Sequence, residues 1–136
     1  MSRRTAVVLF YVALGAGSLA NGLWMLLSPA SWYAGIPAAV PDTGPLNYHF
    51  VHDLGVVFSV VGLGAFWSAR NLDQCRPVHL GITLFYVGHA LVHVAEISVG
   101  RLPADHWLID LPLTFAPALA LAALSLPAVW TSWTRR

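Results

Sequence analysis

The stretch VHLGITLFYVGHALVHVAEISV, residues 78–99, decides the fold class of this chain. It is about as long as the roughly 20 apolar residues that an α-helix needs to cross a bilayer, and Glu96 is its only Asp, Glu, Lys or Arg. Residues 6–27, 47–69 and 107–130 have the same character. The sequence therefore predicts an all-α fold, a single domain over residues 1–136 that forms an antiparallel bundle of four transmembrane helices.

The composition of the chain excludes several classes of protein. It is 57% hydrophobic and only 10% charged, whereas a soluble domain carries roughly 25% charged residues. Its formal net charge is +1, so it has no basic field of the kind that binds nucleic acid. We therefore expect a multi-pass membrane protein whose main partner is the lipid bilayer.

The polar connections support this organisation. Residues 70–77 and 100–106 are short enough to join neighbouring antiparallel helices. Residues 28–46 contain four prolines, which forbid one continuous helix there. Ser28 before Pro29 resembles an N-cap followed by a first-turn proline, and Trp32 and Tyr33 suit a short element in the membrane interface. We predict an interfacial segment on the outer side.

The arginines predict the orientation. One side of the predicted bundle carries all of them except Arg101: Arg3, Arg4, Arg70, Arg76, Arg135 and Arg136. Cytoplasmic loops carry the excess of positive charge, so both termini are expected in the cytoplasm.

Glycine and proline predict how the helices pack and bend. Close contact between helices in lipid depends on small residues, and six glycines are placed to allow it: Gly15, Gly22, Gly55, Gly62, Gly81 and Gly88. Pro112 and Pro117 should bend the fourth helix, because each removes an amide donor.

Two predicted helices carry a narrow polar stripe. His49, His52 and Asp53 are spaced i, i+3 and i+4, so they share one face of the second helix. The third helix presents a second stripe with spacing i, i+4 and i+7: His89, His93 and Glu96. Carboxylates cost at least about 3 kcal/mol at mid-bilayer, so they require an explanation.

In the predicted topology these stripes lie at one depth. Asp53 and His93 are each roughly 9 Å from the outer end of their helix at about 1.5 Å per residue. Asp110 on the fourth helix is slightly shallower, and Asn21 on the first lies at a similar level. We therefore predict one polar pocket in the outer leaflet, to which all four helices contribute.

Imidazoles and carboxylates in this spacing suit a transition metal, and four-helix bundles hold di-metal sites built from such residues. The predicted ligands of iron, copper or zinc are His49, Asp53, His89, His93 and Glu96, with Asn21, His52 and Asp110 contacting the cofactor. Haem b, held by a histidine of each stripe, is an alternative. His106 is either a ligand at the rim or a helix-entry group beside Asp105. The expected function is redox chemistry on a lipophilic substrate, such as a quinone or an alkyl chain, or metal handling.

Other interpretations remain open. The carboxylates can pair with the histidines in a structural hydrogen-bond network, or relay protons in an ion-coupled transport element. The chain can also be a non-catalytic accessory subunit of a larger membrane complex, or a homo-oligomer. His79, near the cytoplasmic end of its helix, is expected to be interfacial.

The first half of the chain resembles a known group of proteins. The residues that carry the resemblance are Asn21-Gly22-Leu23-Trp24, Ser28 to Tyr33 and Asn47 to Gly55. They are similar to an uncharacterised family of small bacterial four-helix membrane proteins with the motif Asn-x-His-Phe-Val-x-Asp-[Ile/Leu]-Gly. The middle position of that motif is often basic, so His52 departs from it. The resemblance implies a bacterial inner membrane and draws attention to His49 and Asp53, but it implies no reaction.

Overall fold

A computed structural model describes residues 1–134 of the chain. Arg135 and Arg136, which contributed to the predicted orientation, lie outside the described residues. Within residues 1–134 the regular structure is helical, without a strand. The elements are α1 (Arg3–Leu27), α2 (Pro29–Gly35), η1 (Val40–Thr43), α3 (Tyr48–Arg70), α4 (Arg76–Ser98), α5 (His106–Asp110), η2 (Leu111–Phe115), α6 (Ala116–Ser125) and α7 (Pro127–Thr134).

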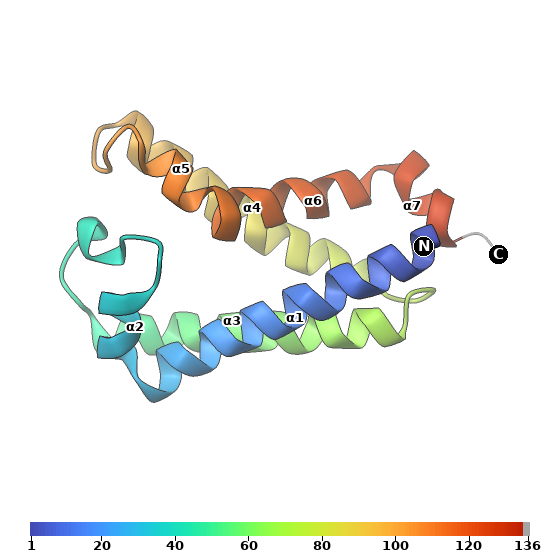
Figure 1. Cartoon of the computed structure of the whole chain (residues 1–136), viewed down its shortest axis with the longest axis horizontal. Helices are drawn as coiled ribbons and strands as arrows, with labels where there is room; N and C mark the ends of the chain where they lie inside the picture. Colours follow the sequence, from blue (N-terminus) through green and yellow to red (C-terminus); the bar gives the residue numbers. More distant parts are fainter. Residues whose placement is uncertain (135–136) are drawn as a thin grey trace.

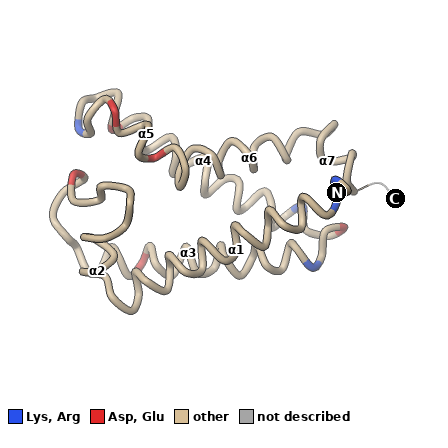
Figure 2. The backbone as a smooth tube through the Cα atoms, viewed as in Figure 1, with Lys and Arg blue, Asp and Glu red and all other residues tan. Residues whose placement is uncertain are grey.

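Four helical stretches are long and apolar enough to cross a membrane, as predicted: α1, α3, α4 and the continuous stretch His106–Ser125. Only 33% of the residues in the most apolar windows of α1 and α3 are buried, and 22% in the other two. Many large apolar side chains of these helices are exposed, among them Leu9, Val60, Leu84 and Leu119, as in proteins that contact lipid. The charged residues gather toward the two ends of the bundle and leave much of its length uncharged (Figure 2).

Helices α1 and α3 begin at residues that satisfy their first amides. The Ser2 side chain accepts a hydrogen bond from the amide of Thr5, and the Asn47 side chain accepts one from the amide of Phe50, each at 3.1 Å. These are N-caps, which replace the hydrogen bonds that the first turn of a helix lacks.

Glycines hold α1 and α3 in close contact. A Cβ atom on Gly22 would lie 2.5 Å from Ser59 Oγ and 2.6 Å from the backbone oxygen of Gly55. A Cβ atom on Gly62 would lie 2.9 Å from the backbone oxygen of Gly15. The predicted role of these glycines is confirmed. It is wrong for Gly81 and Gly88 of α4, where a Cβ atom would meet nothing within 4 Å.

The fourth stretch is bent, as its prolines predict. After α5 the chain forms the π-helical turn η2, in which the amide of Ala116 bonds the carbonyl of Leu111, five residues back. A π-turn accommodates the irregularity near Pro112 and Pro117, neither of which can donate an amide hydrogen. Helix α6 ends at Ser125 and Pro127 starts α7, so the predicted span of residues 107–130 is interrupted at residue 126.

Two hydrogen bonds cross the bundle between α1 and α4. Tyr11 Oη lies 2.8 Å from His79 Nδ1, and Ser18 Oγ lies 2.9 Å from Tyr86 Oη. The partners are seven residues further along in both helices, so α1 and α4 run in the same direction. His79 is fully buried between the helices, and its Nε2 atom lies 2.8 Å from Ser125 Oγ of α6. Its predicted depth at the membrane interface stays a prediction.

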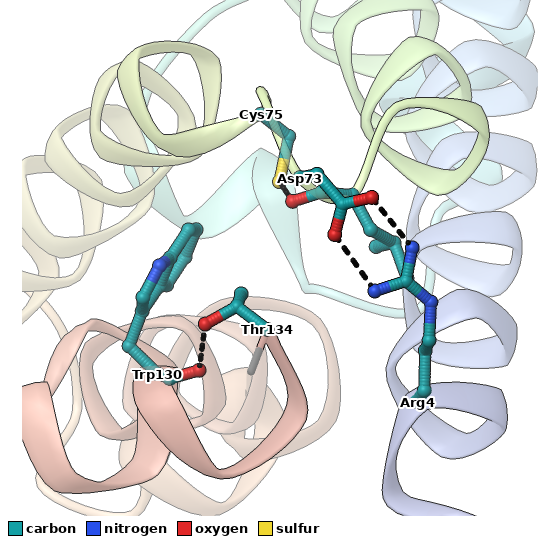
Figure 3. A network of polar contacts seen from close by, with 6 residues as sticks. Arg4, Asp73, Cys75, Trp130 and Thr134 are labelled. Atoms are coloured by element: carbon teal, nitrogen blue, oxygen red, sulfur yellow. Dashed lines mark hydrogen bonds and ion pairs between the residues drawn. The ribbon is translucent and has the colours of Figure 1, made fainter. Parts of the chain in front are cut away.

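A polar contact closes the end of the bundle where the N terminus lies. Arg4 of α1 donates two hydrogen bonds, of 2.8 and 3.1 Å, to the Asp73 carboxylate in the α3–α4 loop (Figure 3). Nearby, the Cys75 thiol is fully buried and contacts the carbonyl of Leu72. Helix α7 lies at this same end, whereas α2 and α5 lie at the opposite end, where the layer of α1 and α3 diverges from that of α4 and α6 (Figure 1).

Candidate metal centre

Two histidines share one carboxylate oxygen at the α2–α5 end. His106 and Asp110 are the first and last residues of α5, four apart and hence on one face. Asp110 Oδ2 lies 3.0 Å from His106 Nδ1 and 2.6 Å from Nδ1 of His93 on α4. The side chains of His106 and Asp110 are fully buried, and that of His93 is 17% exposed. The three residues are called the His/Asp triad below.

The loop between α4 and α5 brings these helices together. Gly100 adopts a φ of 74°, in the left-handed region that favours glycine, and ends α4. The amides of Arg101 and Leu102 then bond back to the carbonyl of Glu96. Leu102 is buried, so this turn directs α5 back along α4 and sets His106 and Asp110 opposite His93.

Two buried atoms of the His/Asp triad have no hydrogen-bond partner among residues 1–134. They are His106 Nε2 and Asp110 Oδ1. A buried polar atom without a partner costs about 1–3 kcal/mol, and native proteins keep few of them. The two hydrogen bonds to Asp110 Oδ2 thus leave the polar chemistry of the triad incomplete, and a further bound group would complete it.

The donor set of the triad fits a transition metal. One ligand atom from each residue lies within 4.8 Å of the others, whereas the ligand atoms of a tetrahedral zinc ion, bound at about 2.0–2.1 Å, are roughly 3.3 Å apart. Binding of an ion would therefore draw the most distant ligand atoms together by up to about 1.5 Å. Three protein ligands also leave a fourth coordination position open, as in metal sites that act on a substrate.

A cavity of about 900 Å³ adjoins the triad. It lies between α1, α3, α4 and the fourth stretch, and α2 and η1 contribute to its wall. Its apolar lining includes Leu14, Trp24, Trp32, Phe50, Phe58 and Val92. Its polar lining includes Ser18, Asn21, Tyr86, His89, His93 and Glu96. His93 therefore belongs to both the triad and the cavity, and joins the two.

The structure places the sequence-predicted residues of α4 on this cavity. His89 packs against His93 with ring centroids 4.7 Å apart and edge-on geometry. Glu96 accepts a 2.8 Å hydrogen bond from Arg101, which also lines the cavity. The negative charge of Glu96 is thus paired with the positive charge of Arg101, and together these two residues add no net charge to the cavity lining.

Asn21 of α1 also lies on the cavity. Its side-chain oxygen accepts a 2.8 Å hydrogen bond from the indole nitrogen of the buried Trp32. This bond ties α2 to α1. The amide nitrogen of Asn21 makes no hydrogen bond within residues 1–134, so a donor remains available there.

The polar stripe of α3, His49, His52 and Asp53, lies neither in the His/Asp triad nor in the cavity lining. His49 and Asp53 form a contact of 3.4 Å with each other, and their side chains are 90% and 67% exposed. His52 is exposed as well. The reason is the packing of α3: Gly55 and Gly62 set the face that meets α1, and His49 and Asp53 project from the opposite face. The prediction that all four helices bring a polar group to one pocket is therefore wrong for α3, which lines the cavity with Phe50, Leu54 and Phe58 instead.

His106 is the member of the triad that the sequence left undecided. It was placed at the rim or at the start of a helix, because it lies beside Asp105 in a polar connection. The signal that identifies it is its spacing from Asp110. His106 and Asp110 are i and i+4, the same spacing that singled out the stripes of the second and third helices.

Comparisons with known proteins gave no match: no family model fits the chain, and neither the curated proteins nor the solved structures contain a match.

Proposed function

We propose that this chain is an integral membrane metalloprotein. In this proposal its four long apolar helices form an antiparallel bundle in a bacterial inner membrane, with both termini in the cytoplasm. The N-terminal end of α1, the C-terminal end of α3 and the start of α4 carry Arg3, Arg4, Arg70 and Arg76, as cytoplasmic ends do. The α2–α5 end, with the His/Asp triad, then lies toward the outer face.

The proposed cofactor is one transition-metal ion held by His93, His106 and Asp110. The observation that carries this proposal is the pair of partnerless buried atoms in the triad, His106 Nε2 and Asp110 Oδ1. Neutral imidazole and carboxylate are ligands for iron, copper and zinc. Such an ion supplies redox or Lewis-acid chemistry when bound, and the adjoining apolar cavity supplies space for a lipophilic substrate. Haem held between a histidine of α3 and one of α4 is less well supported, because His49 and His52 are exposed and lie outside the cavity lining.

The experiment is elemental analysis of the protein purified in detergent and reconstituted with iron, copper or zinc. We expect about one equivalent in the wild type and in His49→Gln, and none in His106→Gln or Asp110→Asn. His49→Gln is the matched control, because His49 pairs with an aspartate four residues away, as His106 does, but on the exposed face of α3. Equal metal content in all four proteins would refute the triad as the site.

A purely structural network is the second candidate. Its support is that the contacts of Asp110 Oδ2, at 2.6 and 3.0 Å, are ordinary hydrogen-bond distances. In that case the wild type stays metal-free after reconstitution with each ion. Asp110→Asn would then lower the stability without changing metal content.

A further inference from the structure

We propose that the cavity binds one uncharged, amphipathic ring compound that carries two opposed carbonyl oxygens, as in a quinone. Its oxygens would accept hydrogen bonds from Asn21 on α1 and His89 on α4. The inference deepens the proposed function by naming the substrate class, but binding itself requires no metal.

The register of α1 and α4 places the two donors. The hydrogen-bonded pairs Tyr11–His79 and Ser18–Tyr86 have the same sequence offset, 68 residues. Asn21 and His89 continue that register, each three residues, or about 4.5 Å of helix, beyond Ser18 and Tyr86. Since the two helices run in the same direction, Asn21 and His89 lie at one level.

This third pair is open, unlike the other two. In the first two pairs the phenol ring of a tyrosine crosses the space between α1 and α4. In the third pair, Asn21 and His89 make no hydrogen bond to each other, and both line the cavity. The two helix layers also diverge toward this end of the bundle (Figure 1). A ring from outside the chain can therefore occupy the place that a tyrosine ring takes in the other pairs.

The polar groups of the third pair specify the chemistry of the ring. The Asn21 amide nitrogen is a donor, and a neutral imidazole always offers one N–H. His89 has ring contacts with Phe58, Phe85 and His93 but no hydrogen bond within residues 1–134. Two donors on opposite walls match a molecule with an acceptor oxygen at each end.

Charge and volume fit the rest of such a molecule. Glu96 and Arg101 neutralise each other in the cavity lining, which disfavours a charged ligand there. The volume of about 900 Å³ lies within the range of small-molecule sites, and the apolar lining suits an alkyl or isoprenoid tail.

The test measures binding of decyl-1,4-benzoquinone to the protein in lipid nanodiscs by calorimetry, with empty nanodiscs as the blank. Decylbenzene, which lacks the oxygens, and decanoate, which is charged, are the comparison ligands. We expect saturable binding of one quinone per chain, with decylbenzene and decanoate at least roughly tenfold weaker, about the effect of losing a hydrogen bond. Equal binding of decylbenzene, or tighter binding of decanoate, would overturn the proposal.

Variants locate the ligand. His89→Phe keeps an aromatic ring and removes the donor, so the affinity should fall roughly tenfold. Gly17→Phe should abolish binding, because Gly17 lines the cavity and has open space beside it. Gly81→Phe is the matched control, since Gly81 also has nothing within 4 Å but lies outside the cavity lining. Wild-type affinity in both His89→Phe and Gly17→Phe would place the quinone elsewhere and overturn the proposal.

The metal site and the quinone site can be tested independently of each other. His106→Gln removes a triad residue that does not line the cavity, and it should bind quinone with wild-type affinity. Loss of quinone binding in His106→Gln, with the fold intact, would mean that the ligand is held by the triad instead of by Asn21 and His89.

Discussion

Helix α1 makes two kinds of contact within one bundle. Against α3 its glycines bring backbone to backbone, so that even one added methyl group would collide. Toward α4 it makes the side-chain hydrogen bonds Tyr11–His79 and Ser18–Tyr86, and beyond these the cavity separates the two helices. Small residues therefore close one side of α1, and on its open side the Asn21 amide nitrogen keeps a hydrogen-bond donor that no residue of the described chain uses.

The largest effect should come from the close side. Gly22→Ala places a Cβ atom 2.5 Å from Ser59 Oγ and 2.6 Å from the Gly55 carbonyl, so the two helices must move apart. We expect a loss of about 2–3 kcal/mol in the free energy of unfolding, the range of overpacking in a core. Unfolding in mixed micelles of increasing denaturing detergent measures it.

Gly81→Ala is the control for that variant. The added methyl group meets nothing within 4 Å, and alanine has the higher helix propensity. The stability should stay within about 1 kcal/mol of the wild type, on the favourable side. If Gly22→Ala and Gly81→Ala unfold alike, the close α1–α3 contact is not what holds this pair together.

A smaller loss of stability is expected when the hydrogen bonds between α1 and α4 are removed. Tyr11→Phe leaves the buried His79 Nδ1 atom without its 2.8 Å partner, and we expect a cost of about 1–3 kcal/mol. Tyr86→Phe should cost less, because the Ser18 hydroxyl can turn to a backbone carbonyl one turn back in its own helix. The same detergent unfolding measures both. A larger loss of stability in Tyr86→Phe than in Tyr11→Phe would show that the Tyr11–His79 hydrogen bond does not stabilise the interior of the bundle.

The smallest effect is expected at the exposed end of the bundle. Arg4→Gln removes the ion pair with Asp73, whose side chains are 39% and 44% exposed. Exposed pairs contribute about 0.2–1 kcal/mol, and salt screens them. The difference from the wild type should disappear in high salt. A difference that salt leaves unchanged would indicate that Arg4 acts by packing instead of charge.

The sequence predicts the long helices well because their signal is local. A run of apolar residues is visible without knowing any partner, and Pro112 and Pro117 interrupt a helix wherever it lies. The direction in which a helix face points cannot be predicted in the same way, because it depends on the neighbouring helices. Periodicity places His49 and Asp53 on one face of α3, but the close contact through Gly55 and Gly62 decides that this face points outward.

The candidate site was predictable only in part for the same reason, namely that helix packing is not visible in the sequence. The depth argument drew attention to His93 and Asp110, which the structure brings within 2.6 Å. It leaves His106 undecided between a ligand at the rim and a helix-entry group, because the position of His106 depends on the turn at Gly100 and on the burial of Leu102. Those features depend on how α5 packs on α4. The spacing of residues within one helix carries no information about that packing.

X-ray absorption spectroscopy of the zinc-loaded protein tests whether His93, His106 and Asp110 hold one metal ion. We expect a first shell of nitrogen and oxygen at about 2.0–2.1 Å with the outer-shell scattering of two imidazoles, lost in Asp110→Asn together with the zinc. A zinc spectrum without imidazole scattering, or an unchanged spectrum in Asp110→Asn, would contradict it.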